Sequence, residues 1–178
     1  MPASNEQLDQ WLSDLAAGSR ESLRALYDEL RTPIFRYALA MVHHIQTAED
    51  IAQDTFLELI HSVKHYRRKG NPRAWIFSIV RNQSIDALKI SGRNMPLCES
   101  AQTENFHDEV EDSMEVLRIL AKLEPQEREI VSMYVFGGLK QTEIAKVLKL
   151  PYITVRAKYG YAIKKLRRQM ERSADNER

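Results

Sequence analysis

The sequence predicts an all-α protein made of two small helical domains joined by an extended acidic linker. Apolar residues recur at helical spacing from end to end, while the alternating pattern of a half-buried strand is nearly absent. Charge divides the chain into three parts. Residues 1–90 carry 11 basic and 11 acidic side chains, 91–112 carry 1 and 6, and 113–178 carry 14 and 8. We therefore expect a balanced domain over 1–90, a linker over 91–112 and a basic domain over 113–178.

Composition excludes several classes of protein. A chain of 178 residues fits one medium domain or two small ones. Cys98 is the single cysteine, which rules out an intramolecular disulfide and a cysteine-rich zinc site. No stretch of 18 consecutive apolar residues occurs, and the first residues lack the basic and apolar pattern of a signal peptide. The sequence therefore predicts a cytoplasmic protein without membrane insertion.

The first helices are predicted from capping residues and prolines. Ser19 can accept a hydrogen bond from the first turn of a helix that runs toward Leu30. Pro33 is expected to open or kink the next segment, which continues to Val42, because proline lacks a backbone N–H.

Two further helices complete the predicted first domain. Thr47 is the expected cap of a helix over 48–65. Asn71 is the expected cap of the next helix, with Pro72 in its first turn, where a missing N–H costs nothing. This helix is predicted to end near Ile90.

The second domain is expected to begin near Ser113. The preceding segment, 91–112, combines turn-forming residues with acidic clusters and little periodicity, as in a linker. A helix over 114–123, a second from Pro125 to about Phe136, and a stop at Gly137 and Gly138 are predicted next.

Residues 140–168 have the outline of a helix-turn-helix: a short helix, a tight turn and a long basic helix. Ala145 is small where two helices must approach closely, and Pro151 suits the first turn of the second helix. A helical wheel places Tyr152, Val155, Tyr159, Ala162, Ile163 and Leu166 on a packing face. Thr154, Ala157, Lys158, Tyr161, Lys164, Lys165 and Arg168 lie opposite, where cationic side chains can meet phosphates or guanine edges. An ordinary amphipathic helix with a solvated basic face is the alternative.

Two other surfaces in the first domain have functional patterns. Asp50, Gln53, Asp54 and Leu57 share one helix face, opposite a core stripe of Ala52, Phe56, Leu59 and Val63. An apolar residue ringed by polar ones is typical of a docking surface, although a solvated acidic face is an equal alternative. Cationic and aromatic residues alternate over 64–82, a pattern that suits single-stranded nucleic acid.

No catalytic site, metal site or cofactor is predicted. Glu58, His61 and His65 have helical spacing that could hold a metal, but no further cluster completes such a site. A glycine-rich phosphate loop and a nucleophilic serine motif are both missing from the sequence. We expect a protein that binds rather than an enzyme.

Three segments together resemble a known family. AEDIAQDTFLELI, RAWIFSIVRNQSIDAL and the stretch from LEPQEREIVSMYVFGG to AIKKLR resemble regions 2 and 4 of bacterial RNA polymerase sigma factors of the extracytoplasmic-function (ECF) group. The resemblance covers nearly the whole chain in the family's order. It implies a factor that binds core RNA polymerase and promoter DNA and catalyses nothing itself. A dimeric helix-turn-helix repressor or activator with a helical sensor domain is the alternative.

The resemblance also implies roles for particular residues. It assigns binding to the β′ clamp helices of the polymerase to Asp50, Gln53, Asp54 and Leu57, with the β flap as a second polymerase contact. It assigns the −10 element to Lys64, Tyr66, Arg67, Arg68, Lys69, Asn71, Arg73, Phe77, Arg81 and Asn82. It assigns the −35 element to Thr154, Arg156, Ala157, Lys158, Tyr161 and Lys165. An anti-sigma factor is a further expected partner.

Three positions depart from the family pattern. Lys149 stands where the family usually has glycine, so the turn must be strained there or place Lys149 in the left-handed conformation. Ala157 replaces a usual serine and Tyr159 a usual leucine. These changes make the promoter sequence harder to predict than the function.

Overall fold

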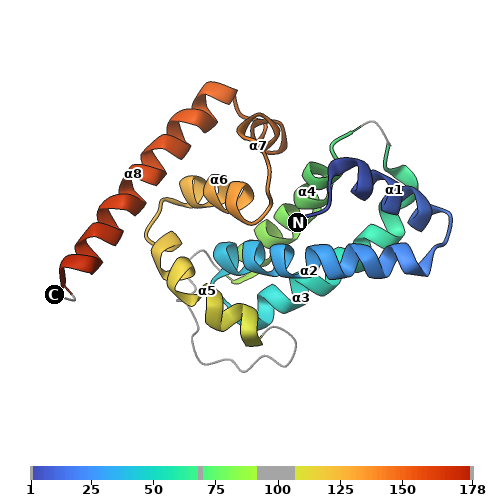
Figure 1. The fold of residues 1–178 in the computed structure, drawn as a ribbon, viewed down its shortest axis with the longest axis horizontal. Helices are drawn as coiled ribbons and strands as arrows, with labels where there is room; N and C mark the ends of the chain where they lie inside the picture. The colour runs from blue at the N-terminus through green and yellow to red at the C-terminus, as the bar shows by residue number, and fades with distance from the viewer. Residues whose placement is uncertain (1, 68–69, 92–106, 177–178) are drawn as a thin grey trace.

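Helix α2 (Arg20–Val42) is the central element of the computed structural model, which describes residues 2–67, 70–91 and 107–176. Its apolar side chains Leu26, Leu30, Ile34 and Phe35 are fully buried. Burial of each contributes about 1.5–3 kcal/mol. Helices α1 (Asn5–Ala16), α3 (Ile45–Ser62) and α4 (Pro72–Ser91) pack around α2 (Figure 1).

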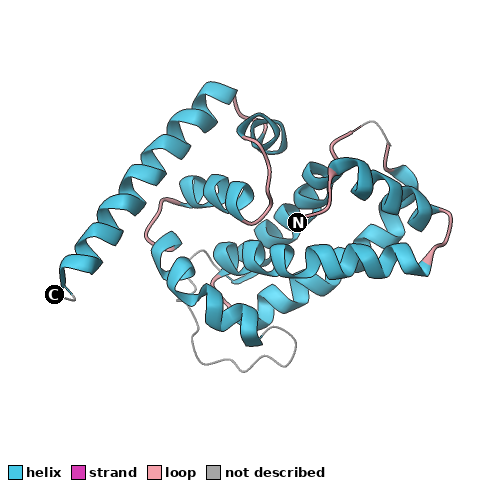
Figure 2. Cartoon of the chain, in the orientation of Figure 1, coloured by secondary structure: helices cyan, strands magenta, loops and turns pink. Residues whose placement is uncertain are grey.

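The described residues form eight α-helices and one short 3₁₀ helix, Val63–His65, with no strand among them (Figure 2). The prediction of an all-α fold is therefore confirmed. The remaining helices are α5 (His107–Leu120), α6 (Pro125–Val135), α7 (Gln141–Leu148) and α8 (Tyr152–Asn176).

Helix α2 begins as predicted but is not interrupted. The Ser19 side chain accepts a hydrogen bond from the Ser22 N–H at 3.2 Å, which confirms it as the cap. Pro33 was expected to open or kink a separate segment, but it lies inside one continuous helix. Leu30 and Ile34, on either side of Pro33, are fully buried. Their packing outweighs the hydrogen bond that proline cannot donate.

The starts of α3 and α4 differ in how well the sequence predicted them. The cap of α3 is His44 rather than Thr47: His44 Nδ1 accepts from the Thr47 N–H at 3.2 Å, so the helix begins earlier. Asn71 caps α4 as predicted, because its Oδ1 accepts from the Ala74 N–H at 2.9 Å. Pro72 is the first residue of α4.

The predicted linker is shorter than expected. Helix α5 begins at His107, within the segment 91–112 that was assigned to the linker. Residues 92–106, which include Cys98, lie outside the described residues. Four of the six acidic residues assigned to the linker, Asp108, Glu109, Glu111 and Asp112, lie in α5.

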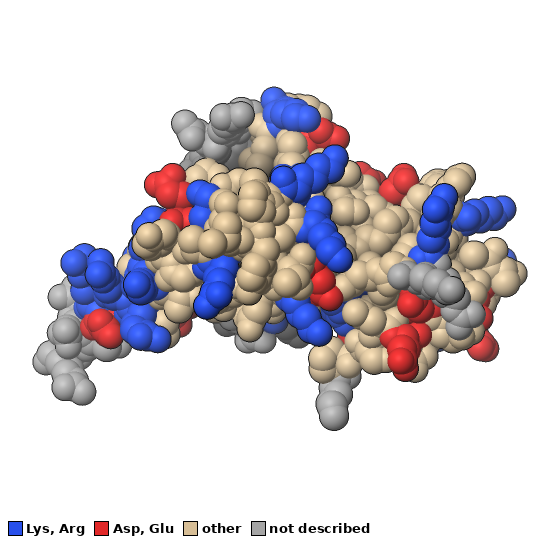
Figure 3. All heavy atoms as spheres, turned by 90° about the horizontal axis from the view of Figure 1, so that it is seen from above, with Lys and Arg blue, Asp and Glu red and all other residues tan. Residues whose placement is uncertain are grey.

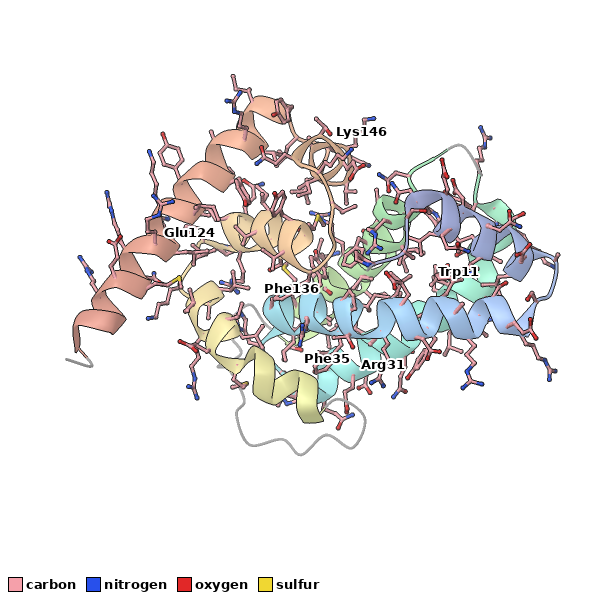
Figure 4. All side chains as sticks on the ribbon, viewed as in Figure 1. Trp11, Arg31, Phe35, Glu124, Phe136 and Lys146 are labelled. Atoms are coloured by element: carbon pink, nitrogen blue, oxygen red, sulfur yellow. The ribbon has the colours of Figure 1, made fainter. Side chains whose placement is uncertain are left out.

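The second half of the chain packs against the first. Helix α6 contacts α2 and α8, and α7 contacts α4 and α8 (Figure 1). Phe136 lies between the end of α6 and α2 (Figure 4). A Cβ atom on Gly137 would lie 2.5 Å from the Met133 carbonyl oxygen, and Gly138 has φ +64°. The turn between α6 and α7 therefore requires glycine at 137 for space and favours it at 138 for its backbone conformation.

Two features are absent from the described ranges. None of their helices combines the length and apolar character needed to cross a bilayer. Nor do the described residues bring together three or more His, Cys, Asp or Glu side chains that could hold a metal ion.

Candidate nucleic-acid interface

Helices α7 and α8 form a helix-turn-helix with a defined turn. Lys149 ends α7 in the left-handed conformation, with φ 53° and ψ 41°. The Leu150 N–H donates to the Ala145 carbonyl oxygen at 3.0 Å, which closes the end of α7. Ile144 of α7 and Val155 of α8 are fully buried. The direction of α8 is thus held by both the turn and the packing.

Helix α8 begins one residue later than predicted. Pro151 precedes the helix instead of standing in its first turn, and its carbonyl oxygen accepts from the Thr154 N–H at 3.0 Å. Proline therefore stands at the cap position of α8, and Tyr152 is the first helical residue.

One side of α8 is buried and the other is exposed. Val155 and Ala162 are fully buried, and the Tyr159 ring packs on Tyr134 of α6 with centroids 4.9 Å apart. The opposite side, here called the α8 face, is exposed and consists of Ile153, Arg156, Ala157, Tyr161 and Lys164. Lys and Arg atoms gather over the end of the molecule that α8 forms (Figure 3). A basic, exposed helix side following a fixed turn suits the major groove of duplex DNA.

The predicted −35 residues fall into three groups. Arg156, Ala157 and Tyr161 lie on the α8 face, whereas Thr154 and Lys158 are half-buried at its edge. Lys165 lies elsewhere, because its Nζ makes an ion pair with Glu127 of α6 at 2.7 Å. The helical wheel placed Lys165 among the outer residues because the position of α6 cannot be read from the sequence of α8. Tyr152, expected to pack, is exposed.

Helix α3 presents the predicted acidic face. Asp50, Gln53, Asp54 and Leu57 are all exposed and are here called the α3 face. The predicted core stripe, Ala52, Phe56, Leu59 and Val63, is buried. The Thr55 hydroxyl donates to Gln83 Oε1 of α4 at 2.7 Å, which ties α3 to its neighbour. Leu57 is 54% exposed, with Gln53 and Asp54 one turn before it and Ile60, which is 39% exposed, one turn after it. This arrangement fits a docking surface with an apolar anchor beside polar residues.

The loop before α4 has exposed cations and one anchored tyrosine. Lys64 and Arg67 are exposed, whereas Arg68 and Lys69 lie outside the described residues. The Tyr66 ring packs on Trp75 with centroids 4.7 Å apart, and its hydroxyl donates to the Asp9 carboxylate. Burial and this hydrogen bond raise the pKa of Tyr66. Tyr66 is therefore held in place by the protein itself.

Two predicted −10 residues belong to the interior. Phe77 is fully buried and meets the Tyr37 ring edge-on, with centroids 5.6 Å apart. Arg73 is buried, with Nη2 donating to the Ala3 carbonyl oxygen at 3.1 Å and to Glu29 at 3.3 Å. Both were expected to be available to DNA. They are not, because α4 is covered on one side by α2 and on another by the turn after α6.

The other α4 candidates lie beside the second half of the chain. Asn71, Arg81 and Asn82 are here called the α4 face. Asn82 is exposed, but the Asn71 amide donates to the Glu143 carboxylate of α7. Arg81 Nε pairs with Glu129 of α6 at 2.6 Å.

Glu129 is itself a buried group. Its side chain is 9% exposed, and burial raises its pKa while Arg81 partly opposes the rise. The hydroxyl of the fully buried Tyr37 lies in the same surroundings, and burial together with Glu129 raises the pKa of Tyr37 well above its ordinary value. The ion pair between Arg81 and Glu129 therefore joins α4 to α6 with its carboxylate buried and its guanidinium partly exposed.

A third polar contact joins the halves at the end of α2. His43 has φ 58° and its Nε2 accepts from the Arg128 guanidinium of α6. Burial and the Arg128 charge lower the pKa of His43 to about 4. Neither Arg128 nor the two carboxylates of α6 and α7 were among the predicted site residues. The sequence around Arg128, Glu129 and Glu143 does not indicate that these side chains would contact α2 and α4.

Comparison with protein families gives two matches of the same kind. The family model for Sigma-70 region 2 matches residues 26–94, and that for Sigma-70 region 4 matches residues 113–166. Together these matches span well over half of the chain. The chain is 29% identical to the ECF RNA polymerase sigma factor SigL of Mycobacterium tuberculosis over 164 residues, covering 88% of this chain and 93% of that protein. It is 25% identical to the RNA polymerase sigma factor YlaC of Bacillus subtilis over 169 residues, covering 89% and 98%.

Two solved structures have a similar fold. CnrH, solved in complex with the cytosolic domain of CnrY, superposes with a TM-score of 0.72 at 22% identity, covering 93% of this chain and 97% of that one. The sigma factor RpoE of Bartonella quintana, solved with the anti-sigma factor NepR, superposes with a TM-score of 0.66 at 17% identity, covering 86% and 98%.

Proposed function

Because the chain belongs to the sigma-70 family of RNA polymerase sigma factors, and within it to the ECF group, we propose that its two halves read two separate promoter elements. A sigma factor is a DNA-binding regulatory subunit that directs RNA polymerase to promoters. We assign the α8 face to the −35 duplex, the α4 face to the −10 strand and the α3 face to the polymerase. No reaction of its own is assigned to the chain.

The exposed side of α8 is the observation that carries this proposal. A major groove about 12 Å wide admits an α-helix. Arg156 and Lys164 lie on the α8 face, and within the described residues neither is paired with an acidic side chain. Their charges are therefore available for phosphates or guanine edges. Tyr161 lies between them, and Thr154 and Lys158 lie at the edge.

The α3 face is assigned to the core enzyme. Leu57 can fill an apolar site on the partner while Asp50 and Asp54 pair with basic groups around it. We propose the β′ clamp helices as this partner and the β flap as a second contact of the 113–178 segment. The chain then acts in the cytoplasm, where transcription takes place.

The α4 face is assigned to the unpaired −10 strand. Lys64, Arg67 and Asn82 are exposed and can meet it directly. Asn71 and Arg81 instead contact Glu143 and Glu129, carboxylates that occupy the donors a phosphate or base would use. We propose that α6 and α7 must move away from α4 before the −10 strand binds. Base capture requires unstacking at a cost of roughly a few kcal/mol, which contacts in the protein offset.

An inhibitory partner is also proposed. The structure of RpoE from Bartonella quintana contains an anti-sigma factor, and its fold resembles this chain. We propose that a partner of the same class binds this protein and keeps it from the polymerase.

Reconstituted transcription tests the proposal. The protein mixed with core enzyme is expected to form a holoenzyme and to initiate from a subset of promoters. Asp54→Arg is expected to abolish core binding while duplex DNA binding persists. Asn82→Ala is expected to keep core binding and slow strand opening, measured with a fluorescent base in the −10 segment.

A matched control uses a second exposed carboxylate. Asp86→Arg on α4 makes the same charge change away from the α3 face, and its side chain is 68% exposed. It is expected to bind core enzyme like the wild type. Failure of the wild-type protein to bind core enzyme or to support initiation would refute the proposed function.

A further inference from the structure

Ile153 is a large apolar side chain on the outer side of α8. It is 75% exposed, whereas Val155, two residues later and on the opposite side of the helix, is fully buried. Among the large apolar side chains in the described part of α8, that of Ile153 is the most exposed. A large aliphatic group in this position gains free energy when a partner covers it.

The surface beside Ile153 is an open hollow of about 390 Å³. Its lining residues are Ile153, Arg156, Ala157, Gly160, Tyr161 and Lys164. A Cβ atom on Gly160 would meet nothing within 4 Å, so the protein's own packing does not require glycine there. Glycine inside a helix costs about 0.5–1 kcal/mol relative to alanine. The low surface around Ile153 is thus not explained by contacts within the chain.

Position and charge identify what covers this surface. Residues at the N-terminal end of the second helix of a helix-turn-helix contact base edges, and Ile153 is the second residue of α8. Arg156 and Lys164 border the hollow and give it the charge that suits a phosphate backbone. Both the position and the charge fit duplex DNA. An acidic protein surface would fit the charge but would not account for the helix-turn-helix geometry.

Base chemistry narrows the contact further. Among the groups that standard bases show in the major groove, the C5-methyl of thymine is the apolar one. We propose that Ile153, with Ala157 one turn later, contacts a thymine methyl in the −35 duplex and makes that position specific for thymine. This inference rests on the assignment of the α8 face to the −35 element. It adds a residue and a base type that the sequence did not suggest.

Removal of a single methyl group tests the proposal. Duplexes that bind the reconstituted holoenzyme are selected from a random library upstream of a fixed −10 element. Each thymine of the selected −35 segment is then replaced by deoxyuridine, which lacks only the methyl. At one position the wild-type protein is expected to lose affinity by about fourfold, the value for one buried methyl-sized group.

Variants connect that loss to Ile153. Ile153→Ala is expected to bind the thymine and deoxyuridine duplexes equally, whereas Ile153→Val retains most of the preference. Met170→Ala is the matched control, because Met170 is 60% exposed on the same helix but lies well beyond the hollow. It is expected to discriminate like the wild type. Thermal unfolding checks that each variant is folded.

The outcomes separate the two proposals. Duplex binding with no thymine position sensitive to deoxyuridine, or with sensitivity unchanged in Ile153→Ala, overturns the inference and leaves the proposed function standing. Failure of the holoenzyme to select any −35 sequence overturns both.

Discussion

The α8 face and the α4 face were both predicted to bind DNA, but the fold treats them differently. Arg156 and Lys164 of the α8 face make no ion pair within the described residues, whereas Arg81 and Asn71 of the α4 face meet carboxylates of α6 and α7. Positive charge alone therefore does not identify an accessible DNA surface. A carboxylate from a distant segment of the chain can accept the same hydrogen bonds. It is already held nearby by the fold, whereas DNA must lose translational and rotational entropy to bind.

The largest expected effect separates the two aromatic candidates. Phe77→Ala is expected to lower the free energy of unfolding by about 3–5 kcal/mol, because the ring is fully buried against Tyr37. Tyr161→Ala should change it by less than about 0.5 kcal/mol, because Tyr161 is 62% exposed, and should weaken duplex binding. Urea unfolding measures the first quantity. A stable Phe77→Ala protein would mean that α4 is not covered as the structure shows.

A second test opens the α4 face. Glu129→Gln is expected to lower the free energy of unfolding by roughly 1–3 kcal/mol, because it removes a charge-assisted hydrogen bond to Arg81. It should also increase binding of a single-stranded −10 oligonucleotide, since Arg81 is released. Fluorescence anisotropy with the labelled oligonucleotide measures this gain.

Its control changes the same charge on an exposed pair. Asp86→Asn on α4 removes a carboxylate that pairs with Lys89 at 3.0 Å in solvent. It is expected to alter stability by less than about 1 kcal/mol. If both variants increase single-strand binding equally, net charge rather than release of Arg81 is responsible.

A third test uses pH at the contact between α2 and α6. The folded protein lowers the pKa of His43 to about 4 from its ordinary value of 6.5. As pH falls from about 6.5 to 4, the unfolded chain takes up a proton that the folded chain does not. The stability from this site is therefore complete above about pH 6.5 and is lost through that window, by about 1–2 kcal/mol after allowance for partial exposure of the ring.

Substitution isolates the histidine. His43→Asn keeps a residue that tolerates positive φ and removes the titrating ring. The difference in unfolding free energy between pH 7 and pH 4.5 is expected to be smaller in this variant, while His61→Asn, at an exposed position of α3, behaves like the wild type. The pKa of Glu129 is raised, so its titration stabilises the folded protein as pH falls, which opposes the effect of His43. This contribution is present in the wild type and in both variants. An unchanged pH dependence in His43→Asn would contradict the assignment.

Local features of the fold were predictable from the sequence, and contacts between distant segments were not. The caps Ser19 and Asn71 follow from the chemistry of one helix end each, so a short window of sequence suffices. For Lys149 the family pattern left two alternatives, and the structure has the left-handed one. Pro33 was expected to open or kink a segment, but it does not begin a new helix, because the burial that keeps α2 continuous involves other helices.

The same limit applies to the site. The α3 face was predicted because its residues and its core stripe lie on one helix. Phe77, Arg73 and Lys165 were assigned to DNA from the sequence of single helices and from the family resemblance, neither of which shows the neighbouring helices. Their burial or pairing depends on α2, the turn after α6, and Glu127. Ile153 was also missed, although its spacing from Ala157 and Lys164 places it on the outer side of the helix.

The smallest expected effect distinguishes two cations of α8. Arg156 is exposed on the α8 face, whereas Lys165 pairs with Glu127 at 2.7 Å and its side chain is 44% exposed. If Arg156 neutralises one phosphate, Arg156→Gln should reduce the slope of log affinity against log salt by about 0.9. Lys165→Gln removes the same charge but should leave that slope unchanged, because its ammonium already has a carboxylate partner. Titrations of duplex DNA at several salt concentrations measure both slopes. Equal reductions would mean that the charge of α8 acts as a whole and that the distinction between exposed and paired cations has no consequence for binding.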